Sequence, residues 1–236
     1  VYAPEGSEVN SFLNSIDAYN NREENPTNWE INSHLGNNYL EKMIAEKPGN
    51  VMVVSGKNSK KIDYILSAVK AGINVYADKP LVTNPEGLEK LMQVFDIAEK
   101  NNVLVYDIMT ERFEVTTAIQ KALSMSQSIF GELLDGTLEN PAISKESVHH
   151  LFKYVSGKPL VRPAWFLDTK QQGEGIIDVT THLVDLVQWE AFPNQIIQSS
   201  DVNMLTARRW ATILYQDQFK KITGLDSYPD YLQKDL

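Results

Sequence analysis

Residues 51–55, Val-Met-Val-Val-Ser, decide the fold, because two similar apolar runs follow this one at regular spacing. A continuous apolar run of this length predicts a strand that is buried on both faces of a sheet. Residues 73–77 (Ile-Asn-Val-Tyr-Ala) and 103–107 (Val-Leu-Val-Tyr-Asp) predict two further strands. Apolar residues recur at helical spacing between the strands, so we expect helices over residues 59–71 and 84–100.

The order strand–helix–strand–helix–strand predicts right-handed crossovers and a parallel sheet, that is, an α/β fold of the Rossmann type. Ligands of such sheets bind beyond the carboxyl ends of the strands. Three loops are therefore expected at the mouth of a binding site. They are residues 55–59, 77–81 and 107–113.

The segment before the first of these strands predicts a helix over residues 7–19, a long polar loop over residues 20–38 and a short helix from Tyr39 that ends before Pro48. The chain begins with Val1 on what reads as a strand end, so we expect residues to be missing upstream.

The pattern changes after about residue 108, which predicts two domains, residues 1–107 and residues 108–236. The second domain is expected to be α+β, with a mostly antiparallel sheet that is incomplete at the C-terminus. Strands are predicted over residues 131–137 and 196–206, and residues 208–215 fit either a strand or a helix.

The composition is that of a globular protein, with 42% hydrophobic and 22% charged residues. The net charge of −9 argues against a broad surface for nucleic acid or anionic membrane. The chain has no cysteine, which excludes disulfides, a thiolate nucleophile and a cysteine-based zinc site. No apolar run approaches the roughly 20 residues of a membrane span. The compartment stays open between cytoplasm and periplasm.

Residues 173–189 begin with two glycines and continue as an amphipathic helix. Offsets of three and four residues place Asp178, His182, Asp185 and Trp189 on one stripe of that helix. A histidine between two carboxylates is suited to general-base chemistry, because imidazole exchanges a proton near neutral pH. The alternative is a capped helix with a surface histidine.

The motif Asp78-Lys79-Pro80 directly follows a predicted strand, so Lys79 is expected at the binding edge of the sheet. A lysine there can bind a hydroxyl or carbonyl oxygen and stabilise negative charge that develops on it. The alternative is an ordinary solvated lysine. His149 and His150 would point to opposite faces of a strand, so the sequence predicts no metal site.

Taken together, four segments resemble one known family. Residues 78–81 (Asp-Lys-Pro-Leu) resemble the Glu-Lys-Pro motif of the glucose–fructose oxidoreductase/inositol dehydrogenase/MocA (Gfo/Idh/MocA) family, and residues 173–185 resemble its glycine-rich segment with Asp and His. Residues 54–58 and 111–113 resemble a nicotinamide loop and the Arg-Phe after the last Rossmann strand. The resemblance covers about residues 50–192, and several segments look like a bacterial branch of oxidoreductases with its own C-terminal domain.

The resemblance implies an oxidoreductase that uses NAD or NADP and transfers a hydride between nicotinamide and a sugar, polyol or glycoside hydroxyl. It implies that Lys79 holds and polarises the reacting oxygen, that His182 is the general base and that Asp178 lies beside it. Further residues are expected around the substrate: Asp185, Arg112 and Trp165. Residues expected at the cofactor are Ser55, Gly56, Asn58, Asp78, Lys79, Pro80 and Glu5. The resemblance also implies a homo-oligomer.

The chain departs from the family pattern at several points. The first strand and the glycine-rich turn of the Rossmann domain are absent, and that turn binds pyrophosphate in other members. Asp78 replaces the usual Glu, Lys61 stands where many members have histidine, and Glu174 and Thr180 replace glycines. Two other functions therefore stay open: a catalytically silent binding relative, and a glycosidase or lyase that retains NAD and oxidises its substrate transiently.

Overall fold

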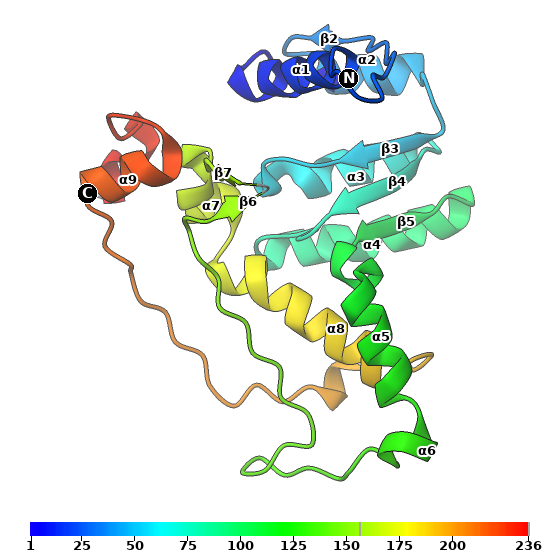
Figure 1. Ribbon diagram of the computed structural model, residues 1–236. Helices are drawn as coiled ribbons and strands as arrows, with labels where there is room; N and C mark the ends of the chain where they lie inside the picture. The colour runs from blue at the N-terminus through cyan, green and yellow to red at the C-terminus, as the bar shows by residue number, and fades with distance from the viewer. Residues whose placement is uncertain (156, 236) are drawn as a thin grey trace.

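A parallel sheet of three strands forms the centre of the computed structural model, which describes residues 1–155 and 157–235 (Figure 1). The strands are β3 (Val51–Val54), β4 (Asn74–Asp78) and β5 (Val105–Ile108), hydrogen-bonded in that order. Val54 pairs with Ala77 in the ladder. The predicted α/β fold with a parallel sheet is confirmed.

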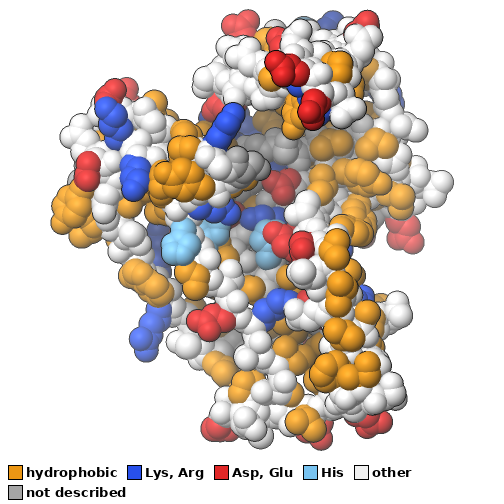
Figure 2. Space-filling model, in the orientation of Figure 1, with side chains coloured by type: hydrophobic (Ala, Val, Ile, Leu, Met, Phe, Trp, Pro, Cys, Tyr) orange, Lys and Arg blue, Asp and Glu red, His pale blue; other side chains and the backbone are white. Residues whose placement is uncertain are grey.

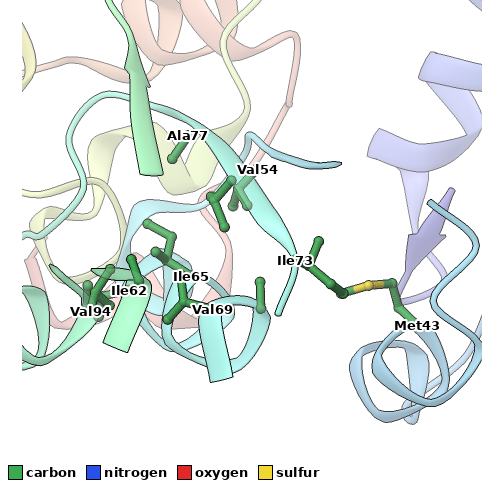
Figure 3. Close-up of a cluster of buried hydrophobic side chains, with 11 residues drawn as sticks. Met43, Val54, Ile62, Ile65, Val69, Ile73, Ala77 and Val94 are labelled. Carbon is green, nitrogen blue, oxygen red and sulfur yellow. The ribbon is translucent and has the colours of Figure 1, made fainter. Parts of the chain in front are cut away.

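Helices α3 (Lys61–Lys70) and α4 (Pro85–Asn101) connect these strands and pack against each other on one face of the sheet. A short 3₁₀ turn, η1 (Asn58–Lys60), precedes α3. The Asn84 side chain caps α4 by accepting a hydrogen bond of 2.8 Å from the Gly87 N–H, and Pro85 occupies the first turn. Apolar side chains of both helices and the strands form the main core (Figure 3).

The prediction that residues 51–55 are buried on both faces of the sheet is wrong. Val54 is buried, whereas Val53 is 65% exposed, and its register neighbours Tyr76 and Tyr106 are exposed too. Successive side chains of a strand point to opposite faces. Two right-handed crossovers that proceed in one direction across a sheet put both helices on the same face, which leaves the other face without them.

A small unit precedes the central sheet. Strands β1 (Tyr2–Ala3) and β2 (His34–Leu35) pair in parallel, and helices α1 (Ser7–Asn20) and α2 (Tyr39–Glu46) accompany them. Both predicted helices and most of the polar loop between them are confirmed. Met43 of α2 reaches the main core, which attaches this unit to the sheet (Figure 3).

The second half of the chain is mainly helical and irregular (Figure 1). Its helices are α5 (Val115–Ser124), α6 (Gln127–Phe130), α7 (Thr169–Gln172), α8 (Thr181–Ala191) and α9 (Gln216–Thr223). Shorter turns are η2 (Thr110–Phe113), η3 (Ala164–Leu167), η5 (Ser199–Asp201), η6 (Asp230–Asp235) and the π-helical turn η4 (Ile176–Thr180). Strands β6 (Tyr154–Val155) and β7 (Lys158–Pro159) form a small antiparallel sheet.

The predicted strands over residues 131–137 and 196–206 are wrong, and residues 208–215 are neither strand nor helix. These segments have the apolar content of strands, but several of their side chains, such as Leu134 and Ile213, are exposed. A strand exists only where a neighbouring strand accepts its backbone hydrogen bonds. Within residues 1–155 and 157–235, no such neighbour pairs with these segments. The same described part contains no helix long and apolar enough to cross a membrane.

Candidate active site

A cavity of about 420 Å³ opens where the carboxyl end of β4 meets the start of α8. Figure 2 shows the corresponding face, with histidine, lysine and carboxylate side chains gathered around a hollow. The cavity is lined by residues from both halves of the chain: Lys79, Glu111, Glu146, Ser147, His149, Lys153, Leu160, Arg162, Asp178, Val179, His182, Leu183 and Leu186.

Lys79 and Asp178 meet at this cavity, although 99 positions separate them in the sequence. The Lys79 ammonium lies 2.8 Å from Asp178 Oδ1 and also donates a hydrogen bond of 2.5 Å to the Asp178 carbonyl. Both side chains are largely buried, with exposures of 17% and 14%. The pair therefore holds the Lys79 ammonium at the strand edge.

Asn58 and Gln172 form hydrogen bonds that hold the Asp178 carboxylate of this pair. The Gln172 amide donates a hydrogen bond of 3.1 Å to Asp178 Oδ1. The Asn58 amide donates to the Gln172 carbonyl at 2.8 Å and to Gln172 Oε1 at 3.1 Å, and both residues are buried. Sequence reasoning placed Asn58 at the cofactor and did not identify Gln172. The structure uses the Asn58 amide nitrogen to position the segment before α8.

His182 lies one turn after Asp178 and lines the same cavity. Its Nδ1 atom is 2.6 Å from Glu111 Oε2, but the buried Nδ1 makes no aligned hydrogen bond. A carboxylate at this position can hold the ring in one orientation and one tautomer once the contact aligns. Sequence reasoning did not assign Glu111 a role, although its position in the loop after β5 was the available signal.

The stripe predicted for α8 is divided in the structure. Asp178 and His182 line the cavity described above, whereas Asp185 and Trp189 line a second cavity of about 450 Å³ together with Arg112. Asp178 lies in the π-helical turn η4, a wider turn that is often found at functional sites.

Arg112 joins the end of β5 to α8. Its Nε atom donates a hydrogen bond of 2.8 Å to Asp185 Oδ2, and its Nη2 atom bonds Asp185 Oδ1. Nη2 also lies 3.6 Å from the Asp107 carboxylate. The hydrogen bonds with Asp185 raise the pKa of the Arg112 guanidinium above its ordinary value. This bidentate pair therefore fixes η2, which carries Glu111, against the helix that carries His182.

Asp185→Asn should lower the free energy of unfolding by about 3 kcal/mol, because it leaves a largely buried Arg112 charge without the carboxylate that it hydrogen-bonds. Urea denaturation of the wild type and the variant measures this loss. Asp63→Asn is the matched control, since it breaks the exposed Lys90–Asp63 pair. The control should cost less than about 1 kcal/mol. Equal losses for the two variants would contradict a structural role for the Arg112–Asp185 pair.

Lys61 is fully buried behind the candidate site. Its ammonium donates a hydrogen bond of 2.7 Å to the Asp78 carbonyl and a longer one of 3.4 Å to the Lys79 carbonyl. Burial lowers the pKa of Lys61 to about 8, although the nearby Asp78 charge acts in the opposite direction. Lys61 thus holds the backbone from which Lys79 projects.

The stability of the fold should rise with pH through the titration of Lys61. The folded protein releases this proton near pH 8, whereas the unfolded chain keeps it to near 10.5. Stability is therefore lost as pH falls through about 8 and is fully present above about 10.5. Relative to Lys61→Met, the wild type should gain about 2 kcal/mol of unfolding free energy between about pH 7.5 and about pH 9.5. Urea denaturation measures the unfolding free energy of both proteins across this pH range. A difference between wild type and Lys61→Met that does not change with pH would contradict the prediction.

The remaining predicted residues lie around the sheet edge or away from it. Ser55 and Gly56 directly follow β3, and Gly56 adopts a φ of +113°, with no atom within 4 Å of a Cβ placed there. Glu5 is exposed after β1, in the separate N-terminal unit. Trp165 lies in η3, where its buried indole nitrogen has no hydrogen-bond partner among the described residues. Glu5 and Trp165 do not line the cavity that holds His182.

Comparisons with known proteins identify the fold and the family. A family model for the NAD-binding Rossmann fold of the Gfo/Idh/MocA oxidoreductases matches residues 4–107. A second model, "Putative oxidoreductase C terminal domain", matches residues 119–236. No curated protein matches the sequence.

Three solved structures are similar to this chain. A "putative oxidoreductase" from Parabacteroides merdae is 54% identical, with a TM-score of 0.93, over 100% of this chain and 54% of that one. A similar protein from Thermotoga maritima (17% identity, TM-score 0.57) is matched over 80% of this chain and 50% of that one. An NAD-binding protein from Listeria innocua (14% identity, TM-score 0.51) is matched over 81% and 52%.

The two more distant structures show the fold alone. This chain spans about half the length of the solved relatives that it matches. The family models together account for nearly all of the chain, and the Parabacteroides protein matches it from end to end. The chain therefore belongs to the Gfo/Idh/MocA oxidoreductase family, with an NAD-binding Rossmann fold followed by the C-terminal domain found in a bacterial branch of oxidoreductases.

Proposed function

We propose that the protein is an NAD- or NADP-dependent dehydrogenase that acts on a hydroxyl group of a sugar, polyol or glycoside. The observation that carries the proposal is the meeting of Lys79, Asp178 and His182 at one cavity on the carboxyl edge of the parallel sheet. Ligands of open α/β sheets bind at this edge. Family membership supports an oxidation or reduction reaction, and the cavity supports the placement of the active site at these three residues.

Oxidation of an alcohol requires the loss of a hydride from carbon and of a proton from oxygen. Lys79 donates a hydrogen bond to the reacting oxygen and stabilises the negative charge that develops on it. His182 takes the hydroxyl proton. Its Nδ1 atom lies beside Glu111, which leaves Nε2 as the ring nitrogen for the substrate. Residues at the sheet edge would hold a nicotinamide, and this cofactor would supply the hydride acceptor.

Asp178 has two roles in this proposal. It holds the Lys79 ammonium through the 2.8 Å ion pair, and its second carboxylate oxygen is left to orient a substrate hydroxyl. Gln172 restrains the first oxygen from the protein side, so the free oxygen keeps a defined direction. Positioning of this kind lowers the entropic part of the barrier.

The residues at the sheet edge fit the nicotinamide half of the cofactor. Gly56 leaves open space beside the end of β3, because a Cβ built on it meets no neighbouring atom. A flat ring can approach the backbone closely at such a position. We assign Ser55, Gly56, Asp78 and Pro80 to this contact, and we propose that Glu5 meets the adenosine ribose.

We also propose that the chain divides into residues 1–107 and 108–236. Lys79 comes from the first part and His182 from the second, so the cavity lies between the two. A homo-oligomer belongs to the same proposal, because the C-terminal domains of such dehydrogenases supply both substrate contacts and subunit interfaces.

Titration of NADH and NADPH tests the proposal. Energy transfer from the four tryptophans to bound nicotinamide provides the signal, and both this chain and the full-length gene product are titrated. Binding by the full-length protein alone would support the proposal and assign the phosphate contacts to the additional residues. Binding by both would mean that the loops of this chain suffice. Binding by neither would favour a silent binding protein.

Net production of NADH separates the dehydrogenase from a glycosidase or lyase. A dehydrogenase converts one NAD to NADH for each substrate molecule, whereas an enzyme that oxidises its substrate transiently returns the hydride within the same turnover. Absorbance of NADH after a single turnover with a candidate sugar distinguishes them. Product without accumulated NADH would contradict the dehydrogenase assignment.

A further inference from the structure

Besides Lys79, the wall of the cavity carries three basic side chains whose role the proposed reaction does not define. They are His149, Lys153 and Arg162. Strands β6 and β7 bring this segment back on itself, and the Leu160 N–H donates a hydrogen bond of 2.8 Å to the Lys153 carbonyl, which extends the pairing. The small antiparallel sheet therefore presents Lys153 and Arg162 to one cavity.

Arg162 is held firmly but carries an uncompensated charge. Its backbone N–H donates a hydrogen bond of 2.8 Å to the Ile222 carbonyl, and its guanidinium lies over the Phe166 ring at 4.4 Å. Nη2 is 3.4 Å from His149 Nε2, and the buried Nε has no partner. Among the ion pairs of the described residues, none involves Arg162 or Lys153.

The electrostatics at His149 indicate that this wall is positive. Burial lowers the pKa of His149, and the charges of Arg162, Lys153 and Lys79 lower it further. Asp178 is the one charge that acts in the opposite direction. Glu111 and Glu146 also line the cavity but are not among the charges that act on this ring. A protein with a net charge of −9 thus keeps a basic wall in its candidate active site.

We infer that the substrate carries an anionic group, a carboxylate or a phosphate, that binds Arg162, Lys153 and His149. This inference rests on the proposed dehydrogenase function and narrows its substrate to acidic or phosphorylated carbohydrates. A guanidinium fork matches the geometry of both anions, and charge-assisted hydrogen bonds are among the strongest in proteins. His149 accepts from Arg162 at Nε2, so its Nδ1–H is left to donate to the anion.

The arrangement also orients the substrate. The residues assigned to the anion and the pair Lys79 and His182 line the same cavity of about 420 Å³, a volume suited to one small ligand. A carbohydrate bound by its acidic group at Arg162 would place its hydroxyls toward Lys79 and His182. Glu146, which also lines the cavity, is available to accept hydrogen bonds from other hydroxyls.

Isothermal titration calorimetry with glucuronate, glucose 6-phosphate and glucose tests the inference on the full-length gene product. At least one anion should bind about 10- to 100-fold more tightly than glucose, the usual effect of a hydrogen-bonded charge. Preference for glucuronate identifies a carboxylate site, and preference for glucose 6-phosphate identifies a phosphate site. Equal binding of all three, or no binding of either anion, would overturn the inference.

Substitutions locate the site. Arg162→Gln and Lys153→Gln should each lower anion affinity by about 10-fold or more and leave glucose affinity unchanged. Lys158→Gln is the matched control, because it removes one positive charge from the exposed strand β7, outside the cavity lining. An equal loss in the control would show a general charge effect and would contradict the assigned site.

Arg162→Lys is a milder variant, because it keeps the positive charge and removes only the two-pronged guanidinium group. It should bind the anion with an affinity between those of the wild type and Arg162→Gln. Circular dichroism reports whether each variant is folded. The titration requires neither cofactor nor turnover, so its result is independent of hydride transfer. If the wild-type protein shows no preference for either anion but binds NADH and turns over, this inference alone is removed. Anion binding without hydride transfer would remove the proposed reaction and leave the site.

Discussion

His182→Ala should lower kcat by about 100- to 10,000-fold, the range expected when a general base is removed. The imidazole lines the candidate cavity one turn after Asp178, and no other described group holds both that position and a ring nitrogen beside a carboxylate. Affinity for NADH should stay close to that of the wild type, because His182 is placed on the substrate side. Steady-state kinetics with the oxidised substrate measure the loss.

His150→Ala is the control for this experiment. His150 is exposed and does not line the cavity, so its substitution should leave kcat unchanged. Glu111→Gln adds a second comparison, because it keeps the size of the side chain that lies beside His182 Nδ1 and removes its charge. It should lower kcat and change the pH profile. Unchanged turnover in His182→Ala would disprove the assigned role.

Lys79→Met should lower kcat by about 100- to 1,000-fold, because it removes the donor that stabilises negative charge on the reacting oxygen. The ammonium is fixed by two contacts with Asp178, at 2.5 and 2.8 Å, so it is already in place before the substrate binds. A preorganised donor of this kind costs no reorganisation in the transition state. The effect should therefore fall mainly on kcat.

Two further variants make the result for Lys79 specific. Lys70→Met removes an exposed lysine at the end of α3, outside the cavity lining, and should leave kcat unchanged. Lys79→Met also leaves the Asp178 carboxylate without its ion pair, which should lower the free energy of unfolding by about 1–3 kcal/mol. Lys79→Met with Asp178→Asn should recover part of that stability without recovering kcat. Recovery of both would indicate a structural role for Lys79.

The fold of the first half could be predicted from short segments. Each strand of the central sheet was an apolar run, each helix had its own period, and Asn84–Pro85 marked a helix start that the structure confirms. The short strand β2 (His34–Leu35) lies in the segment predicted as a polar loop and was not predicted. These signals are local, because they depend on residues within one or two turns of each other. The parallel order follows from them, since a strand that returns through a helix runs in the same direction as the first.

Segments that depend on distant partners could not be predicted in this way. Residues 131–137 have the composition of a strand, yet no neighbouring strand pairs with them in the described chain. Residues 51–55 read as buried on both faces, but the two crossover helices lie on one face, so Val53 stays exposed. In both cases burial depends on what packs against the segment, which its own residues do not encode.

The candidate site also has a part that could be predicted from the sequence and a part that could not. The sequence by itself indicated Lys79, Asp178 and His182, because each lies in a short motif beside a strand end or along a helix. Only the tertiary structure decided that Asp178 bonds Lys79, that Asp185 turns to Arg112, and which partners stand behind them. Three residues of the site were found only through the tertiary structure. Glu111 contacts His182 and Gln172 contacts Asn58, each across at least 70 positions of the sequence, and Arg162 lines the shared cavity. Periodicity along one chain segment sets which residues share a face, whereas packing between segments sets what that face meets.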